Sequence, residues 1–193
     1  MAEISSEARF IHAIEMGLGA WQWGDRIFWQ FGQGYSDKEV HDAFKLSVEE
    51  GIRFVDTAEA YGNGLSESSL GLVFARLGLP EDAHVATKVR YPADRLGDIR
   101  SYTRESVRAS LERLRMRRVA LLQLHNSITV RRGDEPTSLT PEDVLGRGGV
   151  LDTFRELQAD GLVDFLGLTG IGQPESMRAV VDSGVFDTIQ VPF

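Results

Sequence analysis

The 193-residue sequence contains no cysteine, which excludes disulfides, thiolate zinc sites and cysteine nucleophiles. Acidic residues outnumber basic ones, and the formal net charge is −8. Because a protein that wraps nucleic acid or coats an anionic membrane needs a basic face, neither is an expected partner. No apolar run approaches the roughly 20 residues of a membrane span, and residues 1–9 lack the basic start and apolar stretch of a secretory signal. A soluble, cytoplasmic protein is therefore predicted.

What the sequence does contain is an alternation of short apolar runs with amphipathic helical patterns, which is typical of parallel βα units. We expect strands at residues 16–21, 53–56, 84–88, 119–124, 163–168 and 187–191. Helices are expected to begin at Ser36, Ser66, near Thr103, near Val150 and at Pro174. The pattern predicts one α/β domain over residues 1–193, with six strands and five crossover helices. Two long insertions, 22–35 and 126–148, follow strand ends and are candidate substrate loops.

Three chemically capable residues, Asp56, Lys88 and His125, each stand at the end of a different predicted strand. In a parallel α/β fold the carboxyl ends of the strands meet on one face, where such folds place their active sites. Taken singly, a strand-end Asp is more often a turn former and a lone His more often structural. Their convergence is the functional signal.

Lys88 is conspicuous because the chain has only three lysines against 18 arginines, and the other two lie on the polar side of a predicted helix. A lysine is a compact charge whose proton affinity responds to burial and to neighbouring charges, unlike a guanidinium. Tyr61 follows Asp56 by five residues in a glycine-rich loop, which could return its phenol over the strand ends. A phenol is a weak acid unless a nearby cation stabilises the phenolate, and a Lys held by an Asp provides that cation. These groups fit proton delivery to a carbonyl oxygen.

The motifs around these residues resemble the signature of the aldo-keto reductases. The matching segments are GIRFVDTAEAYG at residues 51–62, Ser66-Glu67, Leu70-Gly71, Ala86-Thr87-Lys88, SLERL at residues 110–114, LQLH at residues 122–125 and Gly167-Leu168-Thr169. The resemblance runs from about Met16 to Phe193 and keeps its order throughout.

The resemblance implies a (β/α)8 TIM barrel that uses NADPH, with NADH as the alternative, and no metal, to reduce an aldehyde, ketone or sugar carbonyl to an alcohol. It makes Tyr61 the general acid, tuned by Lys88 and Asp56, and makes His125 the residue that binds the carbonyl. The implied cofactor-binding residues are Gly19, Ala20 and Trp21 beside the nicotinamide ribose, Thr169 and Gln190 at the carboxamide, and Asp56.

Two departures from the family pattern accompany this resemblance. Thr169-Gly170 stands where the family usually has Ser-Asn, which affects one amide contact to the nicotinamide. The chain also ends at Phe193, whereas family members continue through two more strands that complete the cofactor site. We therefore expect about six of the eight βα units here, a C-terminally incomplete barrel, and no activity from the 193 residues alone. The full-length protein is expected to be a monomer.

Two alternatives stay open at this point. One is a catalytically silent barrel that binds nicotinamide cofactor as a regulatory or sensor subunit. The other is that the 193 residues are themselves the product, with edge strands at 16–21 and 187–191 exposed unless something covers them, so that the chain associates or aggregates.

The sequence also contains a cluster of aromatic residues and a cluster of arginines. The aromatic residues in and just before the first insertion either pack inward in part or form an apolar wall for the substrate, and their number favours the wall: Trp21, Trp23, Phe28, Trp29 and Phe31. The arginines at 113, 115, 117 and 118 fall at a predicted helix C-terminus, where cations complement the helix dipole, so a structural role is favoured over a basic binding patch.

Overall fold

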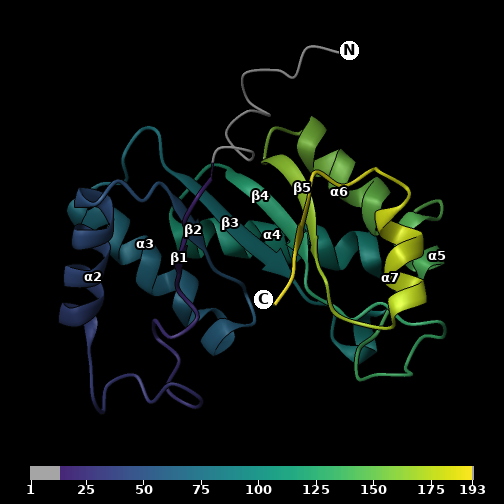
Figure 1. Cartoon of the computed structure of the whole chain (residues 1–193), viewed down its shortest axis with the longest axis horizontal. Helices are drawn as coiled ribbons and strands as arrows, with labels where there is room; N and C mark the ends of the chain where they lie inside the picture. The colour runs from purple at the N-terminus through teal and green to yellow at the C-terminus, as the bar shows by residue number, and fades with distance from the viewer. Residues whose placement is uncertain (1–13, 193) are drawn as a thin grey trace.

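The structure is a computed structural model and describes residues 14–192. Six parallel strands form one sheet in chain order, as the alternating sequence pattern predicts. The strands are β1 (Leu18–Gly19), β2 (Phe54–Asp56), β3 (His84–Val89), β4 (Val119–Leu124), β5 (Val163–Thr169) and β6 (Thr188–Gln190). The sheet is curved, and β1 and β6 are its two edges (Figure 1).

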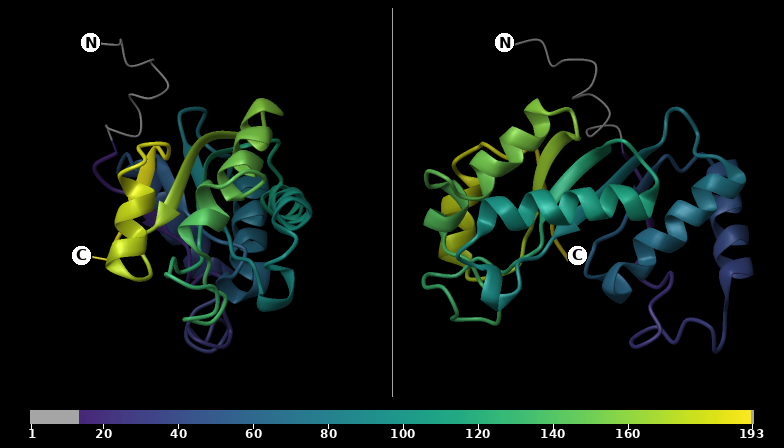
Figure 2. Two further views of the ribbon diagram at one scale, coloured as in Figure 1. Left: turned by 90° about the vertical axis from the view of Figure 1, so that its right-hand side faces the viewer. Right: turned by 180° about the vertical axis from the view of Figure 1, so that it is seen from behind.

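The helices are α2 (Asp37–Glu49), α3 (Leu65–Leu77), α4 (Ile99–Leu114), α5 (Pro141–Leu145), α6 (Val150–Ala159) and α7 (Pro174–Val181). Seen from behind, α4 lies across the outer face of the sheet between α3 and α6 (Figure 2). The buried apolar side chains of these helices and strands form one core between the two layers. None of the described helices has the length and apolar character needed to cross a membrane.

Several helix boundaries follow the sequence signals. The capping box predicted at Ser36 is present, with Glu39 reaching back to the Ser36 backbone N–H at 2.8 Å. Pro174 begins α7 in the first turn, where its missing N–H leaves no hydrogen bond unmade. Helix α6 begins at Val150, as expected.

Other boundaries differ from the prediction. Ser66 does not cap α3; the N-cap is Gly64, whose φ of 87° turns the backbone, and the Ser66 hydroxyl instead donates to the Ala20 carbonyl at 2.5 Å. Helix α4 begins at Ile99, four residues before Thr103, because η2 (Ala93–Arg95) and Asp98 already lead the chain into it.

The opening strand is shorter than the predicted 16–21. Only Leu18 and Gly19 pair with β2, opposite Val55 and Asp56. The Ala20 backbone N–H still donates to the Asp56 carbonyl at 2.9 Å, so the chain stays beside β2 for one further residue.

One glycine allows α3 and α4 to approach closely. A Cβ atom at Gly71 would lie 2.0 Å from the Arg113 carbonyl oxygen, so only glycine fits this crossing. The close crossing brings the last turn of α4 beside the first turn of α3, so side chains from these two turns can contact each other.

Candidate active site

The strand ends bring a lysine, an aspartate and a tyrosine into direct contact. Nζ of Lys88, on β3, lies 2.6 Å from Oδ2 of Asp56 on β2 and 3.1 Å from the hydroxyl of Tyr61. Nζ also donates to the Thr57 carbonyl at 2.9 Å, so all three ammonium hydrogens have acceptors. Lys88 is 1% exposed. The structure therefore places these three sequence-predicted residues in one cluster.

The backbone after Tyr61 explains how its phenol returns over the strands. Tyr61 begins η1 (Tyr61–Gly64), and the next three residues all have positive φ: 56° at Gly62, 57° at Asn63 and 87° at Gly64. Two glycines and an asparagine are the residues that tolerate this left-handed conformation best. The chain thus reverses within four residues and leaves the Tyr61 ring over Lys88, whose Nζ lies 4.8 Å from the ring centroid.

His125, one residue beyond β4, completes the cluster. Its ring meets that of Tyr61 edge-on, with centroids 5.6 Å apart and an interplanar angle of 88°. Burial, followed by the charges of Lys88 and Arg90, lowers the pKa of His125 to about 4. The imidazole is therefore neutral near pH 7 and can donate one hydrogen bond and accept another. Its Nδ1 atom is buried and has no hydrogen-bond partner within residues 14–192.

Sequence reasoning missed a glutamine that holds the Asp56 carboxylate. Nε2 of Gln123, on β4, donates to Oδ1 of Asp56 at 3.2 Å, and Gln123 is 2% exposed. Nε2 of Gln190, on β6, lies 3.4 Å from Oδ2 of the same carboxylate. The signal was present, because Gln123 is the one polar residue in a strand that otherwise reads as a uniform apolar run.

A layer of polar residues lies beneath the cluster. Ser66 shares a hydrogen bond of 2.8 Å with Thr57, whose carbonyl accepts from Lys88. Beside it, the fully buried carboxylate of Glu67 accepts from Thr87 and, at 2.7 Å, from Nε of Arg113. Both networks link the start of α3 to strands β2 and β3, so they fix the backbone that carries Asp56 and Lys88.

The first insertion supplies an aromatic wall with three members rather than five. Trp21 stacks on Tyr61 with centroids 5.4 Å apart and on Phe28 at 5.1 Å, and Trp29 meets Trp21 edge-on. All three are partly exposed. Trp23 is 4% exposed and Phe31 packs against the core, so these two are the members of the set that pack inward. Their rings anchor the loop to the core.

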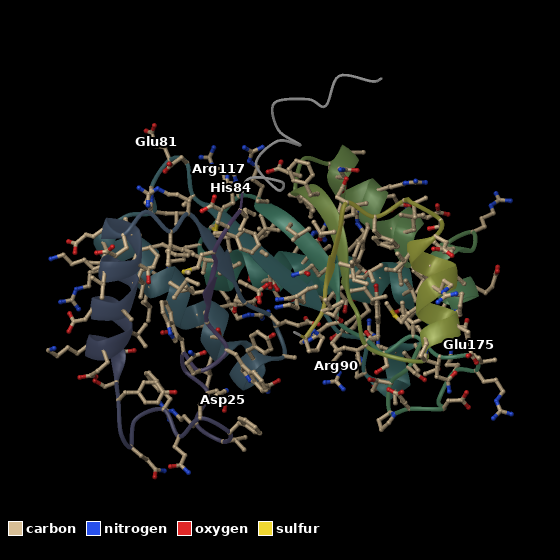
Figure 3. All side chains as sticks on the ribbon, viewed as in Figure 1. Asp25, Glu81, His84, Arg90, Arg117 and Glu175 are labelled. Atoms are coloured by element: carbon tan, nitrogen blue, oxygen red, sulfur yellow. The ribbon has the colours of Figure 1, made fainter. Side chains whose placement is uncertain are left out.

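A pocket of about 510 Å³ opens over these groups at the carboxyl ends of the strands. Its lining residues are Trp21, Ala60, Tyr61, Lys88, Arg90, His125, Thr169, Ile171, Gln190, Val191 and Pro192. Figure 3 shows Arg90 at this end, whereas His84 and Arg117, which begin or precede strands, lie at the opposite end. Three of the six expected cofactor residues therefore line the pocket: Trp21, Thr169 and Gln190.

The other expected cofactor residues lie beside the pocket, outside its lining. Gly19 is in register with Asp56 across β1 and β2. Ala20 is fully buried, and its carbonyl accepts the hydrogen bond from the Ser66 hydroxyl. Asp56 is engaged by the three donors described above, from Lys88, Gln123 and Gln190. Within the described residues, no group of three or more acidic or histidine side chains could hold a metal ion.

The chemistry open to this arrangement is proton transfer to an oxygen. A phenol beside a fixed ammonium can release its proton, because the cation stabilises the phenolate that remains. A neutral imidazole facing the same phenol can hydrogen-bond the accepting oxygen. Of the aromatic wall, Trp21 lines the pocket itself.

Comparison with known proteins identifies the family. The family model described as "Aldo/keto reductase family" matches residues 15–192. Among curated proteins, the chloroplastic pyridoxal reductase of Arabidopsis thaliana is 36% identical over 118 residues, which cover 57% of this chain and 32% of that protein. The chain spans about half or less of the length of the curated relatives it matches.

Solved structures of similar fold include aldo-keto reductases. The glycerol dehydrogenase AKR11B4 of Gluconobacter oxydans has a TM-score of 0.65 at 27% identity, covering 92% of this chain and 50% of that one. An aldo-keto reductase of Klebsiella pneumoniae, solved in complex with NADPH, has a TM-score of 0.68 at 23% identity, covering 92% and 53%. The six-stranded sheet corresponds to part of the (β/α)8 barrel of these proteins. The chain belongs to the aldo-keto reductase family.

Proposed function

We propose that the protein reduces an aldehyde, ketone or sugar carbonyl to an alcohol with NAD(P)H, and that Tyr61 is the general acid. One observation carries the proposal: Nζ of Lys88 is held 2.6 Å from Asp56 and 3.1 Å from the Tyr61 hydroxyl. A buried cation fixed against a phenol serves little structural purpose, yet it is what a tyrosine needs in order to donate a proton at neutral pH.

In the proposed mechanism, the substrate carbonyl oxygen sits between Tyr61 and His125. Neutral His125 donates a hydrogen bond that orients the oxygen and stabilises the charge developing on it. Tyr61 then transfers its phenolic proton to that oxygen. Lys88 stabilises the phenolate left behind, and Asp56 keeps the ammonium in place and balances its charge.

The pocket suits a nicotinamide on the side of β5 and β6. The carboxamide of that ring has one acceptor and two donors, and Thr169 and Gln190 offer a hydroxyl and an amide at the pocket wall. Because the Thr169 hydroxyl donates to the Leu124 carbonyl at 3.1 Å, its oxygen remains able to accept an N–H. When bound, the nicotinamide supplies the hydride to the carbonyl carbon. We propose NADPH over NADH, a choice supported by the NADPH found in the Klebsiella pneumoniae structure.

Turnover assays on the protein expressed from its complete gene test this function. We expect NADPH oxidation, followed at 340 nm, with at least one member of a panel of aldehydes, ketones and aldoses. Binding of NADPH with no turnover across the panel would favour a silent cofactor sensor. A failure to bind NADPH or NADH at all would contradict both functions.

Further properties belong to the same proposal. We propose that residues 1–193 alone do not turn over, since their six-stranded sheet is open between β1 and β6. We also propose that the whole protein is a monomer of the cytoplasm that binds a small carbonyl compound and no nucleic acid. Light scattering after size exclusion, and assays of the 193-residue chain beside the whole protein, test the first two points.

A further inference from the structure

Arg90 lies where a cation can reach the substrate. It directly follows β3, two residues beyond Lys88, and side chains two apart on an extended chain point to the same side at a spacing of about 6.6 Å. Arg90 lines the pocket together with Lys88, Tyr61 and His125. Figure 3 shows its side chain at the carboxyl end of the sheet.

The backbone of this segment is fixed by three separate elements. The Arg90 N–H donates to Oε1 of Glu59 at 2.7 Å, and its carbonyl accepts from the hydroxyl of Tyr102 on α4 at 3.2 Å. The next residue, Tyr91, donates its N–H to Oδ1 of the buried Asn126 at 2.9 Å. A residue anchored in this way presents its side chain from a defined position, which lowers the entropy lost when a ligand binds.

The Arg90 guanidinium itself has no hydrogen bond or ion pair within residues 14–192. Both nearby carboxylates have other partners. Oxygens of Asp56 accept from Lys88 and Gln123, and those of Glu59 accept from the Arg90 backbone and from Ser106. Arg90 is exposed, as are other arginines without an ion pair in the described chain, and its place at the mouth of the pocket is what distinguishes it.

The charge of Arg90 acts inside the pocket. The pKa of His125 is lowered first by burial, then by Lys88 and then by Arg90. The electrostatic influences on Glu59, in contrast, include Glu67 and Arg113 and involve Arg90 only through its backbone N–H. Arg90 therefore lies between two cavities: it lines the pocket with His125, and it also lines a neighbouring cavity of about 440 Å³ with Glu59 and Tyr102.

We propose, on the basis of the function above, that Arg90 binds an anionic group of the substrate. The substrate class is then a carbonyl compound that also carries a carboxylate or a phosphate. Both anions match the planar fork of a guanidinium, which forms two parallel charge-assisted hydrogen bonds with either. The anion docks at Arg90 while the carbonyl oxygen reaches Tyr61 and His125, so Arg90 sets specificity and takes no part in proton transfer.

Matched pairs of aldehydes test this role in the protein expressed from its complete gene. One pair is 4-carboxybenzaldehyde and methyl 4-formylbenzoate, and the other is glyceraldehyde 3-phosphate and glyceraldehyde. The variants are Arg90→Gln, Arg90→Lys and, as a control, Arg117→Gln, which removes the same charge at the opposite end of the sheet (Figure 3).

We expect Arg90→Gln to raise KM for the charged member of at least one pair about tenfold or more, with kcat little changed, because uniform binding is lost. The neutral members should stay within about twofold, and Arg90→Lys should fall between, since an ammonium lacks the fork. Arg117→Gln should match the unsubstituted protein. An effect confined to one pair assigns the anion as carboxylate or phosphate.

Several results would overturn the proposal. Arg90→Gln could weaken charged and neutral aldehydes equally, or it could raise KM for NADPH instead, which would make Arg90 a cofactor contact. If the unsubstituted protein turns over neither pair, the wider carbonyl panel decides the reductase function separately, and Arg90 is then tested by titrating benzoate against tryptophan fluorescence, since Trp21 lines the pocket. Equal Kd values, within about twofold, for the unsubstituted protein and Arg90→Gln would reject the anion site.

Discussion

The ammonium of Lys88 lies 2.6 Å from the carboxylate of Asp56, and the two side chains are only 1% and 15% exposed. Desolvation makes such a pair costly to bury, so its geometry and its third contact, to Tyr61, give the reason for its presence. The pair holds a cation beside a phenol, and under the proposed function its contribution to folding should be separable from its contribution to activity.

A double-mutant cycle on this pair measures that separation. Lys88→Met leaves a buried carboxylate and should lower the free energy of unfolding by about 3 kcal/mol. Adding Asp56→Asn should restore part of that stability, since neither remaining group is charged. Neither the single nor the double variant should turn over. Recovery of activity in the double variant would contradict the assigned role of the cation, and urea denaturation with carbonyl turnover gives both readouts.

Arg113 should contribute more to the free energy of unfolding than its position at the end of α4 indicates. It is the only charged partner recorded among the described residues for the fully buried carboxylate of Glu67, at 2.7 Å. Arg113→Ala should therefore lower the free energy of unfolding by about 3 kcal/mol. Arg117→Ala, at an exposed arginine without a recorded ion pair in the described chain, should stay within about 0.5 kcal/mol. Equal effects in the two variants, measured by urea denaturation, would show that the Glu67 contact is unimportant.

The lowered pKa of His125 predicts how the free energy of unfolding changes with pH. Burial and two nearby cations lower it to about 4 from an ordinary value of 6.5. Between those values the unfolded chain binds a proton that the folded chain does not, so stability falls as the pH drops from 6.5 towards 4. The loss is on the order of 2 kcal/mol, after discounting for partial exposure. Below pH 4 this contribution no longer changes.

Urea denaturation at several pH values between 4 and 7 isolates this effect. His125→Gln should lose stability less steeply than the unsubstituted protein across that range. His41→Gln, on α2 and away from the pocket, is the matched control and should keep the original slope. Parallel curves for all three proteins would mean that His125 titrates alike in the folded and unfolded states.

The parallel strands and the convergence of Asp56, Lys88 and His125 could be predicted from the sequence, because strand periodicity and strand ends are local signals. It also located the Tyr61 turn through its glycines. It did not show that Ser66 lies inside α3, since a capping serine and a serine that bonds a distant carbonyl look the same in sequence. Long-range contacts of this kind depend on the packing of several elements.

The same limit applies to the pocket. Gln123 could have been found as a lone polar residue in a buried strand, but its partner, 67 residues away, could not. Which aromatic residues pack inward, here Trp23 and Phe31, could not be predicted, because composition does not tell which face of a loop is buried. Arg90 drew no attention, since its role depends on what its neighbours leave unpaired.

The substitution Tyr61→Phe tests the central claim most directly. It removes one hydroxyl and keeps the ring that stacks on Trp21 and covers Lys88. In the protein expressed from its complete gene, with the best carbonyl substrate, kcat should fall at least about a hundredfold, the size of a general-acid contribution. The Kd for NADPH and the unfolding midpoint should stay close to those of the unsubstituted protein. A Tyr61→Phe variant that keeps kcat within about threefold would contradict the account.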